Sequence, residues 1–319
     1  MSYIVTGGAG FVGSNMVRKL NEHGIKDVII IDNYDEKKMP NLMSLEFTDF
    51  IDYTDGIDSV REKLEAKQNV EGIFHIGANA DVLESNPKQM MVMNYEFSKM
   101  YCRYAWNHYL PFIYASSSAV YGNSEHQSTE QESLMPHNIY AWSKWLFDKY
   151  TESNSAKFCD NKVVGFRFFN VFGWGEFHKD KNANIVYRFY EMMRDNGYIN
   201  LFKDEIIRDH VYVDDVVEVM YRALVDDNIT NGIYNLGGNH PISHRRVAEI
   251  VIETMMENGV IERQDPTQCI HLIDMPQELR NKFQFYTHSE NQLDLISEIT
   301  KGNEEKMKSY VKNLILNNK

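Results

Sequence analysis

The sequence has few cysteines and lacks any long hydrophobic run. Its 319 residues include three cysteines, Cys102, Cys159 and Cys269, which lie far apart and do not show the spacing of a metal-binding or redox motif. Three widely separated cysteines favour a reducing, cytoplasmic environment. No stretch approaches the roughly 18 consecutive apolar residues of a membrane-spanning helix, and the first residues lead directly into a strand-like run. We therefore expect neither a membrane segment nor an export signal.

An excess of basic residues is also absent. The chain has 33 Lys and Arg residues against 46 Asp and Glu residues, which gives a net charge of −13. Such a charge repels nucleic acids and anionic lipid surfaces, so we expect neither as a partner. His178 and His210 have no partner at a metal-ligand spacing, and we expect no metal site. A bound phosphate would need a local cluster of donors.

Short β-branched runs alternate with longer amphipathic segments through the first half of the chain. The strand-like runs are residues 3–5, 28–31, 47–51, 72–76, 112–115 and 162–168. Helices are expected at 15–23 and 90–109. Strands separated by helices of this length predict crossover connections, and therefore an α/β fold with a doubly wound parallel sheet.

The regular alternation stops after Phe172, where a polar loop begins. A length of 319 residues with 43% hydrophobic residues is typical of one large domain or two smaller ones, and we expect two. We expect residues 1–172 to form the domain with the parallel sheet. Residues 173–319 would mostly form a smaller C-terminal α/β domain that binds substrate, and some of its segments can return to the first sheet.

A glycine-rich stretch separates the first strand from the first helix. Gly7, Gly10 and Gly13 follow the apolar run that ends at Val5. Glycines at such a junction permit a tight turn, a close approach of the backbone to phosphate, and close packing of helix on strand. The spacing is G-x-x-G-x-x-G rather than G-x-G-x-x-G, so the pattern alone is also compatible with a structural turn.

An acidic residue at the end of the second strand supports a dinucleotide site. Asp32 lies roughly 20 residues beyond the glycines, where a carboxylate can accept from both hydroxyls of an adenosine ribose. The same carboxylate would repel a 2′-phosphate, which favours NAD. Lys37 and Lys38 follow closely enough to hold that phosphate, or they are solvated loop residues. The choice between NAD and NADP stays open at this point.

A tyrosine and a lysine lie four residues apart in a helical segment. Tyr140 and Lys144 share one helix face, where the ammonium and the charge of an oxidised nicotinamide would favour the phenolate. Tyr140 could then exchange a proton with a substrate hydroxyl. Ser117, at the end of a predicted parallel strand, could hydrogen-bond the same oxygen.

Together these residues resemble the extended short-chain dehydrogenase/reductase family, the NAD-dependent epimerases and dehydratases, over nearly the whole chain. The shared motifs are the glycine turn at 6–13, Asp32-Asn33, Gly77-Ala78, Ser117 with Tyr121-Gly122, the pair of Tyr140 and Lys144, and the runs 167–173, 208–215 and 234–237. The resemblance implies a Rossmann-type domain that binds a nicotinamide dinucleotide tightly, and a nucleotide-diphosphate sugar as substrate. It also implies a homo-oligomer that pairs through the helices at 90–109 and 140–153.

Within this family the chain is most similar to the ADP-glyceromanno-heptose 6-epimerases. That similarity rests on residues 114–117, 144–148, 164–171, 178–179 and 283–284. It implies that C6 of the sugar is transiently oxidised and then reduced on its other face. Tyr140 would take the hydroxyl proton, and Lys179 would be a second acid/base group on the opposite side; alternatively, Lys179 is a solvated loop residue.

The resemblance also implies a set of binding residues. The catalytic residues would be Ser117, Tyr140, Lys144 and Lys179. The residues around the dinucleotide would be Gly7, Gly10, Phe11, Val12, Gly13, Asp32, Asn33, Lys38, Gly77, Ala78, Asn94, Tyr140, Lys144 and Val171. The residues around the sugar nucleotide would be Asn170, Arg188, Phe202, Arg208 and Phe283. Arg208 matches a diphosphate contact, although an arginine paired with Asp209 or Asp214 would look the same.

Four departures from the heptose epimerase pattern affect specificity. Asp180-Lys181, Arg188 and Phe283 replace Gly-Ser, a histidine and a tyrosine, which leaves the exact sugar open. Tyr53 replaces a lysine that helps to hold the NADP phosphate, which favours NAD.

Other functions remain as alternatives. A 4,6-dehydratase is disfavoured because Ser118-Ala119 stand where that enzyme has an Asp-Glu pair. The alternatives are a 4-epimerase or a dehydrogenase acting on another nucleotide sugar, and a non-catalytic regulator that binds the cofactor.

Overall fold

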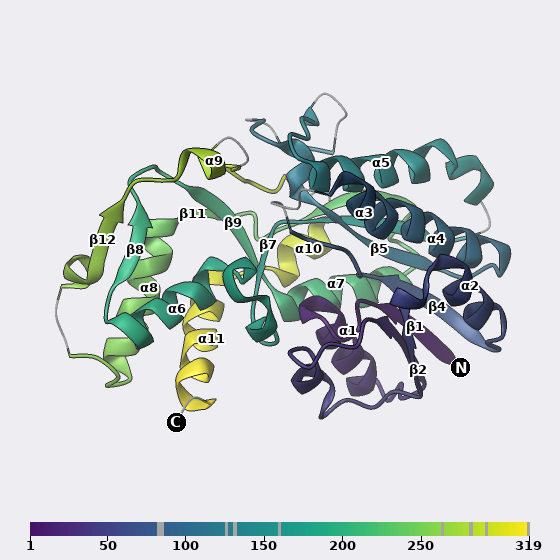
Figure 1. The fold of residues 1–319 in the computed structure, drawn as a ribbon, viewed down its shortest axis with the longest axis horizontal. Helices are drawn as coiled ribbons and strands as arrows, with labels where there is room; N and C mark the ends of the chain where they lie inside the picture. The colour runs from purple at the N-terminus through teal and green to yellow at the C-terminus, as the bar shows by residue number, and fades with distance from the viewer. Residues whose placement is uncertain are drawn as a thin grey trace.

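A parallel sheet forms the centre of the larger part of the molecule (Figure 1). The computed structural model describes residues 1–81, 86–124, 127–129, 133–158, 161–262, 265–280, 283–290 and 293–317, and Cys159 lies outside them. Within these residues the sheet has seven strands in the order β10-β6-β5-β4-β1-β2-β3, all paired in parallel. The strands are β1 (Ser2–Thr6), β2 (Val28–Asp32), β3 (Asp49–Asp52), β4 (Val70–His75), β5 (Phe112–Ser117), β6 (Val163–Phe168) and β10 (Gly232–Leu236). The predicted α/β fold with a doubly wound parallel sheet is confirmed.

Helices cover both faces of this sheet (Figure 1). One layer contains α1 (Phe11–Glu22), α7 (Val213–Val225) and α10 (Asp294–Ile299), and the other contains α2 (Ile57–Glu65), α3 (Pro87–Met91), α4 (Phe97–Asn107) and α5 (Ile139–Ser153). Alternate residues of a strand point to opposite faces. Accordingly Val5 packs with the α1 and α7 layer, and its neighbour Ile4 packs with the other layer.

The helix expected at 90–109 is divided by one π-helical turn. The structure has α3, then the turn η3 (Val92–Glu96), then α4. A π-turn inserts an extra residue into a helix and is often found at functional sites. Asn94 lies in this turn, and its contacts are described below.

The second half of the chain builds a smaller unit and also contributes to the large sheet. Its strands are β7 (Asn170–Phe172), β9 (Ile207–Tyr212) and β11 (Pro241–Ser243) in one sheet, and β8 (Ile199–Phe202) with β12 (Ile270–Ile273) in another. Its helices are α6 (Ile185–Asn196), α8 (His244–Glu257), α9 (Gln277–Arg280) and α11 (Asn303–Asn317). The apolar faces of α6, α8 and α11 pack into one core with Phe172.

Three segments from the second half belong to the layers of the large sheet. Strand β10 pairs with β6, α7 packs against α1, and α10 packs against α7. The division at residue 172 stays a prediction, with these segments on the first-domain side. In the described part of the chain we find no helix that combines the length and the apolar character of a membrane span.

Candidate active site

The glycine-rich turn joins β1 to α1 and touches the segment after β4. Gly7 has a φ of +68°, and a Cβ atom there would lie 2.7 Å from the Cα of Gly77. A Cβ on Gly13 would lie 1.9 Å from the carbonyl oxygen of Gly7, so α1 can pack this close only with glycine at that position. Around Gly10, a Cβ would meet among the described atoms only the same oxygen, at 3.1 Å. Gly10 therefore borders open space.

Helix α1 begins without a capping side chain. Its N-cap residue is Gly10, and no described side chain accepts from the N–H groups of its first turn. Free N–H groups and the helix dipole at such an end favour an anion. The turn therefore fits the pyrophosphate of a dinucleotide, which would lie against Gly10, Phe11, Val12 and Gly13.

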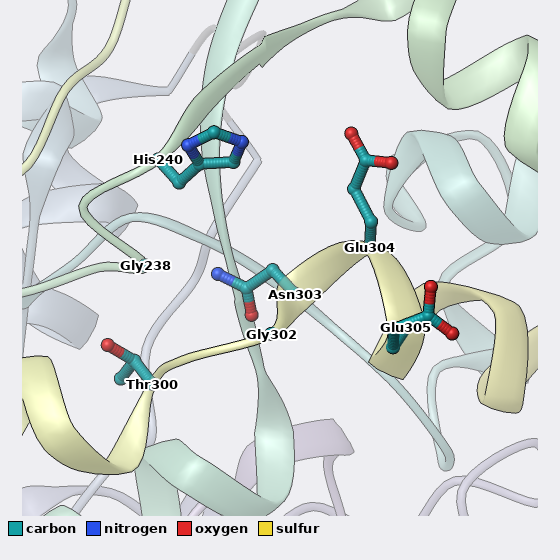
Figure 2. Close-up of a pocket in the computed structure, with 7 residues that line it drawn as sticks. All are labelled: Gly238, His240, Thr300, Gly302, Asn303, Glu304 and Glu305. Carbon is teal, nitrogen blue, oxygen red and sulfur yellow. The ribbon is translucent and has the colours of Figure 1, made fainter.

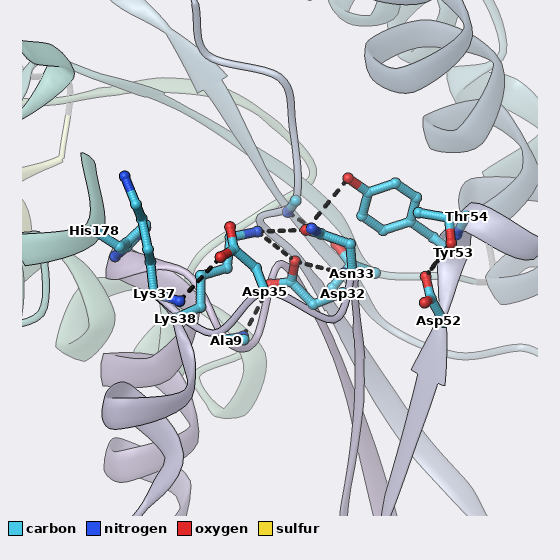
Figure 3. A network of polar contacts seen from close by, with 12 residues as sticks. Ala9, Asp32, Asn33, Asp35, Lys37, Lys38, Asp52, Tyr53, Thr54 and His178 are labelled. Carbon is cyan, nitrogen blue, oxygen red and sulfur yellow. Dashed lines mark hydrogen bonds and ion pairs between the residues drawn. The ribbon is translucent and has the colours of Figure 1, made fainter. Parts of the chain in front are cut away.

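Asp32 ends β2 beside this turn, and its carboxylate is held by three hydrogen bonds (Figure 3). Oδ2 accepts from the Ala9 N–H at 3.0 Å, and Oδ1 accepts from the Asn33 N–H and the Lys38 ammonium, both at 2.8 Å. Lys38 also donates to the side-chain oxygen of Asn33 at 2.6 Å. A carboxylate offers about four acceptor positions, so a ribose hydroxyl can still share Asp32.

The two lysines considered for a 2′-phosphate both have acidic partners. Lys38 is paired with Asp32, and Lys37 forms an exposed ion pair with Asp180 at 2.8 Å (Figure 3 shows both lysines). Tyr53 points its hydroxyl toward the side-chain oxygen of Asn33 at 3.5 Å. Because these positive charges are already compensated, the arrangement suits NAD better than NADP.

Ser117 and Tyr140 come together where β5 ends and α5 begins. Asn138 caps α5 by accepting from the Ala141 N–H at 2.8 Å, which places Tyr140 in the first turn. Burial raises the pKa of the Tyr140 phenol, and a hydrogen bond with Ser117 opposes that rise. The Ser117 hydroxyl oxygen also accepts from the Ala119 N–H at 3.1 Å.

Lys144 lies one turn beyond Tyr140 on α5. Its ammonium donates to the carbonyl oxygen of Ala115, in β5, at 2.8 Å. Burial lowers the pKa of Lys144 to about 8, although Asp148 opposes this shift. The lysine therefore still carries a proton at neutral pH, and β5 and α5 hold Ser117, Tyr140 and Lys144 as one group.

A buried polar network beneath α5 supports Lys144. Asp148 accepts from Arg167 Nε at 2.9 Å, and both side chains are 1% exposed. Arg167 also donates to the Tyr121 hydroxyl at 3.0 Å, and Tyr121 donates to Asn235 at 2.6 Å. Sequence reasoning missed this network because its members come from four separate elements.

Asn94 ties the segment after β4 to α5. Its Oδ1 accepts from the Asn79 N–H and its Nδ2 donates to the Asn79 carbonyl oxygen, each at 2.8 Å. Nδ2 also donates to the Ser143 hydroxyl at 3.0 Å. Through these bonds the π-turn holds the segment that contains Gly77 and Ala78 beside the glycine-rich turn.

Lys179 reaches the start of α1 from the short helix η7 (Phe177–Asn182). Its Nζ lies 5.3 Å from the centroid of the Phe11 ring. Burial lowers the pKa of Lys179, and the carboxylate of Glu176 opposes this shift. Glu176 is itself buried and accepts from the Asn184 N–H at 2.5 Å and from the Tyr310 hydroxyl at 3.3 Å. Sequence reasoning missed Glu176, for which no motif gave a signal.

Two asparagines fasten the loop that carries Lys179 to the part of the molecule that contains the large sheet. Asn15, in α1, donates to the Trp174 carbonyl oxygen at 2.8 Å. Asn41 donates to the carbonyl oxygens of Gly175 at 3.0 Å and Ala9 at 3.1 Å. The loop therefore closes over the glycine-rich turn.

Arg208 is a buried cation that has no acidic partner in the part of the chain that the structure describes. It is 8% exposed, its guanidinium lies 5.0 Å from the centroid of the Phe283 ring, and it donates to Gln284 at 3.3 Å. In the described residues no carboxylate pairs with it, because Asp209 accepts from the backbone of Gly238 and its neighbours and Asp214 pairs with Arg18. Burial lowers the pKa of Arg208 to about 9. An anionic ligand would compensate the buried positive charge of Arg208.

The remaining predicted residues lie in the second half. Asn170 donates to the Asp209 carbonyl oxygen at 2.8 Å and to the Thr287 hydroxyl at 3.0 Å, and its neighbour Val171 lies half-buried in β7. Arg188, on α6, is half-buried and forms no ion pair with any described residue. Burial lowers the pKa of His244, and the positive charges of Arg208 and Arg188 lower it further, so both cations lie around it. Phe202 ends β8, in the separate two-stranded sheet.

A cavity of about 250 Å³ lies outside this set of residues (Figure 2). Its lining residues are Gly238, His240, Thr300, Gly302, Asn303, Glu304 and Glu305. Glu304 pairs with Arg246, and Glu305 pairs with Lys308. Across the described part of the chain, no group of three or more His, Cys, Asp or Glu side chains is placed to hold a metal ion.

Known proteins resemble this chain in sequence and in fold. The model of the NAD dependent epimerase/dehydratase family matches residues 3–237. An ADP-L-glycero-D-manno-heptose-6-epimerase from Fusobacterium nucleatum is 35% identical, over 98% of this chain and 97% of its own. The crystal structure of an ADP-L-glycero-D-manno-heptose-6-epimerase from Helicobacter pylori is 26% identical with a TM-score of 0.80, over 98% of this chain and 95% of that one.

A UDP-glucose 4-epimerase from Thermus thermophilus, solved in complex with NAD, shares the fold. It is 24% identical with a TM-score of 0.76 and covers 98% of both chains. The chain therefore belongs to the NAD dependent epimerase/dehydratase family, as its sequence motifs predicted.

Proposed function

We propose that this chain is a nucleotide-sugar epimerase that inverts C6 of an ADP-linked glycero-manno-heptose with the help of a bound nicotinamide dinucleotide. The names of the relatives from F. nucleatum and H. pylori support this substrate. The chain's own residues support a transient oxidation and reduction of the sugar carbon.

The dinucleotide would be held by the first turn of α1 and by Asp32. When bound, its nicotinamide ring supplies an acceptor and donor of hydride for the carbinol carbon. Tyr140 would remove the proton from the sugar hydroxyl and later return it, while Ser117 hydrogen-bonds the same oxygen. The Lys144 ammonium, fixed to the Ala115 carbonyl oxygen, would lower the cost of a phenolate on Tyr140.

The observation that carries the proposal is the position of Lys179. An epimerase must handle its sugar on two faces, and a second acid/base group is useful on the face away from Tyr140. Lys179 comes from a different element than Tyr140 and lies over Phe11, directly after the glycine-rich turn. Burial lowers its pKa, which makes proton exchange easier near neutral pH.

Arg208 supports a nucleotide diphosphate as the other end of the substrate. A planar guanidinium can bind phosphate oxygens through two parallel hydrogen bonds. Since Arg208 is buried and no carboxylate of the described residues pairs with it, its guanidinium is available for such an anion, and the charge of Arg188 nearby adds to its attraction.

The test is to incubate the purified protein with NAD or NADP and ADP-D-glycero-D-manno-heptose, and then to resolve the two C6 epimers. We expect both epimers to appear without net reduction of the cofactor. An unchanged epimer ratio with the cofactor fully bound contradicts the proposal. Accumulation of reduced cofactor would identify a dehydrogenase, and conversion of UDP-hexoses instead would identify a 4-epimerase.

We also propose that the protein works in the cytoplasm as a homo-oligomer. Trp142 on α5 and Val92 in η3 are 43% and 38% exposed, on the two helical segments that the family resemblance assigns to pairing. Replacing Trp142 by glutamate would convert an oligomer to monomers, which light scattering after size-exclusion chromatography measures. A wild-type protein that elutes as a monomer contradicts this proposal.

A further inference from the structure

We propose that Gln284 is a positioning residue that sets the distance between the anion-binding Arg208 and the catalytic end of β5. Its Oε1 accepts from Arg208 at 3.3 Å, and its Nε2 donates to the Ser118 carbonyl oxygen at 3.3 Å. Ser118 directly follows Ser117. One side chain therefore links the site proposed for the diphosphate to the site proposed for the reacting hydroxyl, so this inference rests on the proposed function.

The two ends of this link come from different parts of the fold. Arg208 lies in β9 of the smaller sheet, and Ser118 begins η4 (Ser118–Tyr121) after the large sheet. A substrate held at one end by Arg208 presents its sugar to Ser117 and Tyr140 at the other end. An error of about 1 Å in such a distance can cost roughly 100-fold in rate. We therefore expect the link to affect the rate of the chemical step more than the affinity for the substrate.

The segment that contains Gln284 is fastened without it. Thr287 accepts from the Asp209 N–H at 2.8 Å, and Ser289 donates to the Asp209 carboxylate at 2.5 Å. Gln127, which is fully buried, donates to the Tyr286 carbonyl oxygen at 3.0 Å and accepts from the His288 N–H at 3.2 Å. Because these bonds hold residues 286–289 in place, the bonds of Gln284 are available for orienting its two partners.

An amide has the right chemistry for this role. It accepts from the guanidinium with one atom and donates to a carbonyl with the other, which a carboxylate cannot do. It also leaves the positive charge of Arg208 uncompensated for an anionic ligand. A glutamate at position 284 would pair with Arg208 and compete with the diphosphate.

The test compares Gln284→Met, Gln284→Glu and the matched control Gln127→Met. The methionine at 284 keeps the packing and removes both hydrogen bonds, so kcat should fall about 10- to 100-fold. Its Kd for ADP, the probe of the diphosphate site, should change less than about threefold. The Gln284→Glu variant should bind ADP about tenfold more weakly or worse. The control loosens the same segment, so its Tm should fall while kcat and the Kd for ADP change less than about threefold.

Three results would overturn the inference. They are a Gln284→Met variant with wild-type kcat, equal Kd values for ADP in the two Gln284 variants, and a loss of kcat in Gln127→Met that equals the loss in Gln284→Met. A failure of the proposed function can be distinguished from a failure of the inference on Gln284. A wild-type protein that binds ADP but does not epimerise ADP-heptose contradicts the function alone, and the Kd values for ADP of the two Gln284 variants then still test whether position 284 acts on the anion site of Arg208. A wild-type protein that does not bind ADP overturns both.

Discussion

The ammonium of Lys179 lies over the ring of Phe11, 5.3 Å from the ring centroid. Phe11 is the first residue of α1, directly after the glycine-rich turn, and Lys179 belongs to a loop of the second half of the chain. The relationship places a titratable group from one part of the fold at the glycine-rich turn of the other. It is the geometric basis on which we propose Lys179 as the second acid/base group of an epimerase.

Replacing Lys179 by methionine should reduce epimerisation about 100- to 10,000-fold, the range expected for loss of a general acid/base group. Binding of NAD, followed by fluorescence quenching, should be unchanged because the proposed dinucleotide site uses the backbone of the turn and not the Lys179 side chain. The matched control is Lys181→Met, an exposed lysine of the same loop, which should keep wild-type activity. Equal epimerase activities of the two variants would show that Lys179 takes no part in the reaction.

Replacing Glu176 by glutamine should shift the pH profile of kcat/KM. The negative charge of Glu176 raises the pKa of Lys179, against the larger lowering effect of burial. Without that charge the pKa of Lys179 falls, and the limb of the profile that reports Lys179 should move to lower pH. Asp180→Asn is the control, because Asp180 is exposed and pairs with Lys37. A limb that stays in place in Glu176→Gln would contradict the coupling.

Lys144 should make the protein more stable as the pH rises above about 8. Its pKa is about 8 in the folded protein against 10.5 for an ordinary lysine, so the folded state loses its proton first. Between these values the unfolded state binds more protons, and the free energy of unfolding increases with pH. Urea unfolding should show a smaller increase in Lys144→Met than in the wild type over this window. Identical pH slopes would show that Lys144 titrates normally in the fold.

Asp180 should influence the choice between NAD and NADP. It pairs with Lys37, one of the two lysines that the sequence offered as a contact for a 2′-phosphate. In Asp180→Asn this lysine is released, so NADP should bind a few-fold more tightly, and NAD should bind as before. The gain should disappear in the double variant with Lys37→Gln and at high salt. An equal change in the affinities for NAD and NADP would show that the pair of Asp180 and Lys37 does not discriminate between the two cofactors.

Alanine at Gly10 and at Gly13 should have different consequences. A Cβ on Gly13 would lie 1.9 Å from the Gly7 carbonyl oxygen, so this variant should lose stability as well as cofactor binding. A Cβ on Gly10 would contact that oxygen at 3.1 Å and otherwise border the proposed pyrophosphate position. Gly10→Ala should therefore stay folded, with a Tm close to wild type, and bind NAD about tenfold or more weakly. Wild-type affinity for NAD in Gly10→Ala would contradict the proposed position of the pyrophosphate.

Much of the fold followed from periodicity in the sequence. The strand predicted at 28–31 is β2 (Val28–Asp32), and the strand predicted at 47–51 is β3 (Asp49–Asp52). The π-turn within the helix predicted at 90–109 could not be foreseen, because the contacts of Asn94 with Asn79 and Ser143 are tertiary. Membership of the family confirms the expected enzyme class and the nicotinamide cofactor.

The site shows where reasoning from sequence ends. The sequence left open whether Arg208 contacts a diphosphate or pairs with Asp209 or Asp214, and the structure gives both acids other partners. Nothing in a sequence predicts that Gln284 connects Arg208 to Ser118, or that Glu176 lies beneath Lys179, because each relationship joins residues that only the tertiary fold brings together. Motifs identified the chemistry of the side chains, and the fold determined which of them interact.

The most direct test of the account follows a deuterium atom on C6 of the sugar. Purified protein with bound NAD is incubated with C6-deuterated ADP-D-glycero-D-manno-heptose in ordinary water, and the product epimer is analysed by NMR and mass spectrometry. Transient oxidation with return of the same hydride predicts that the C6 deuterium is retained in the inverted product. Loss of the label to water, or no inversion with the cofactor bound, would contradict the central claim.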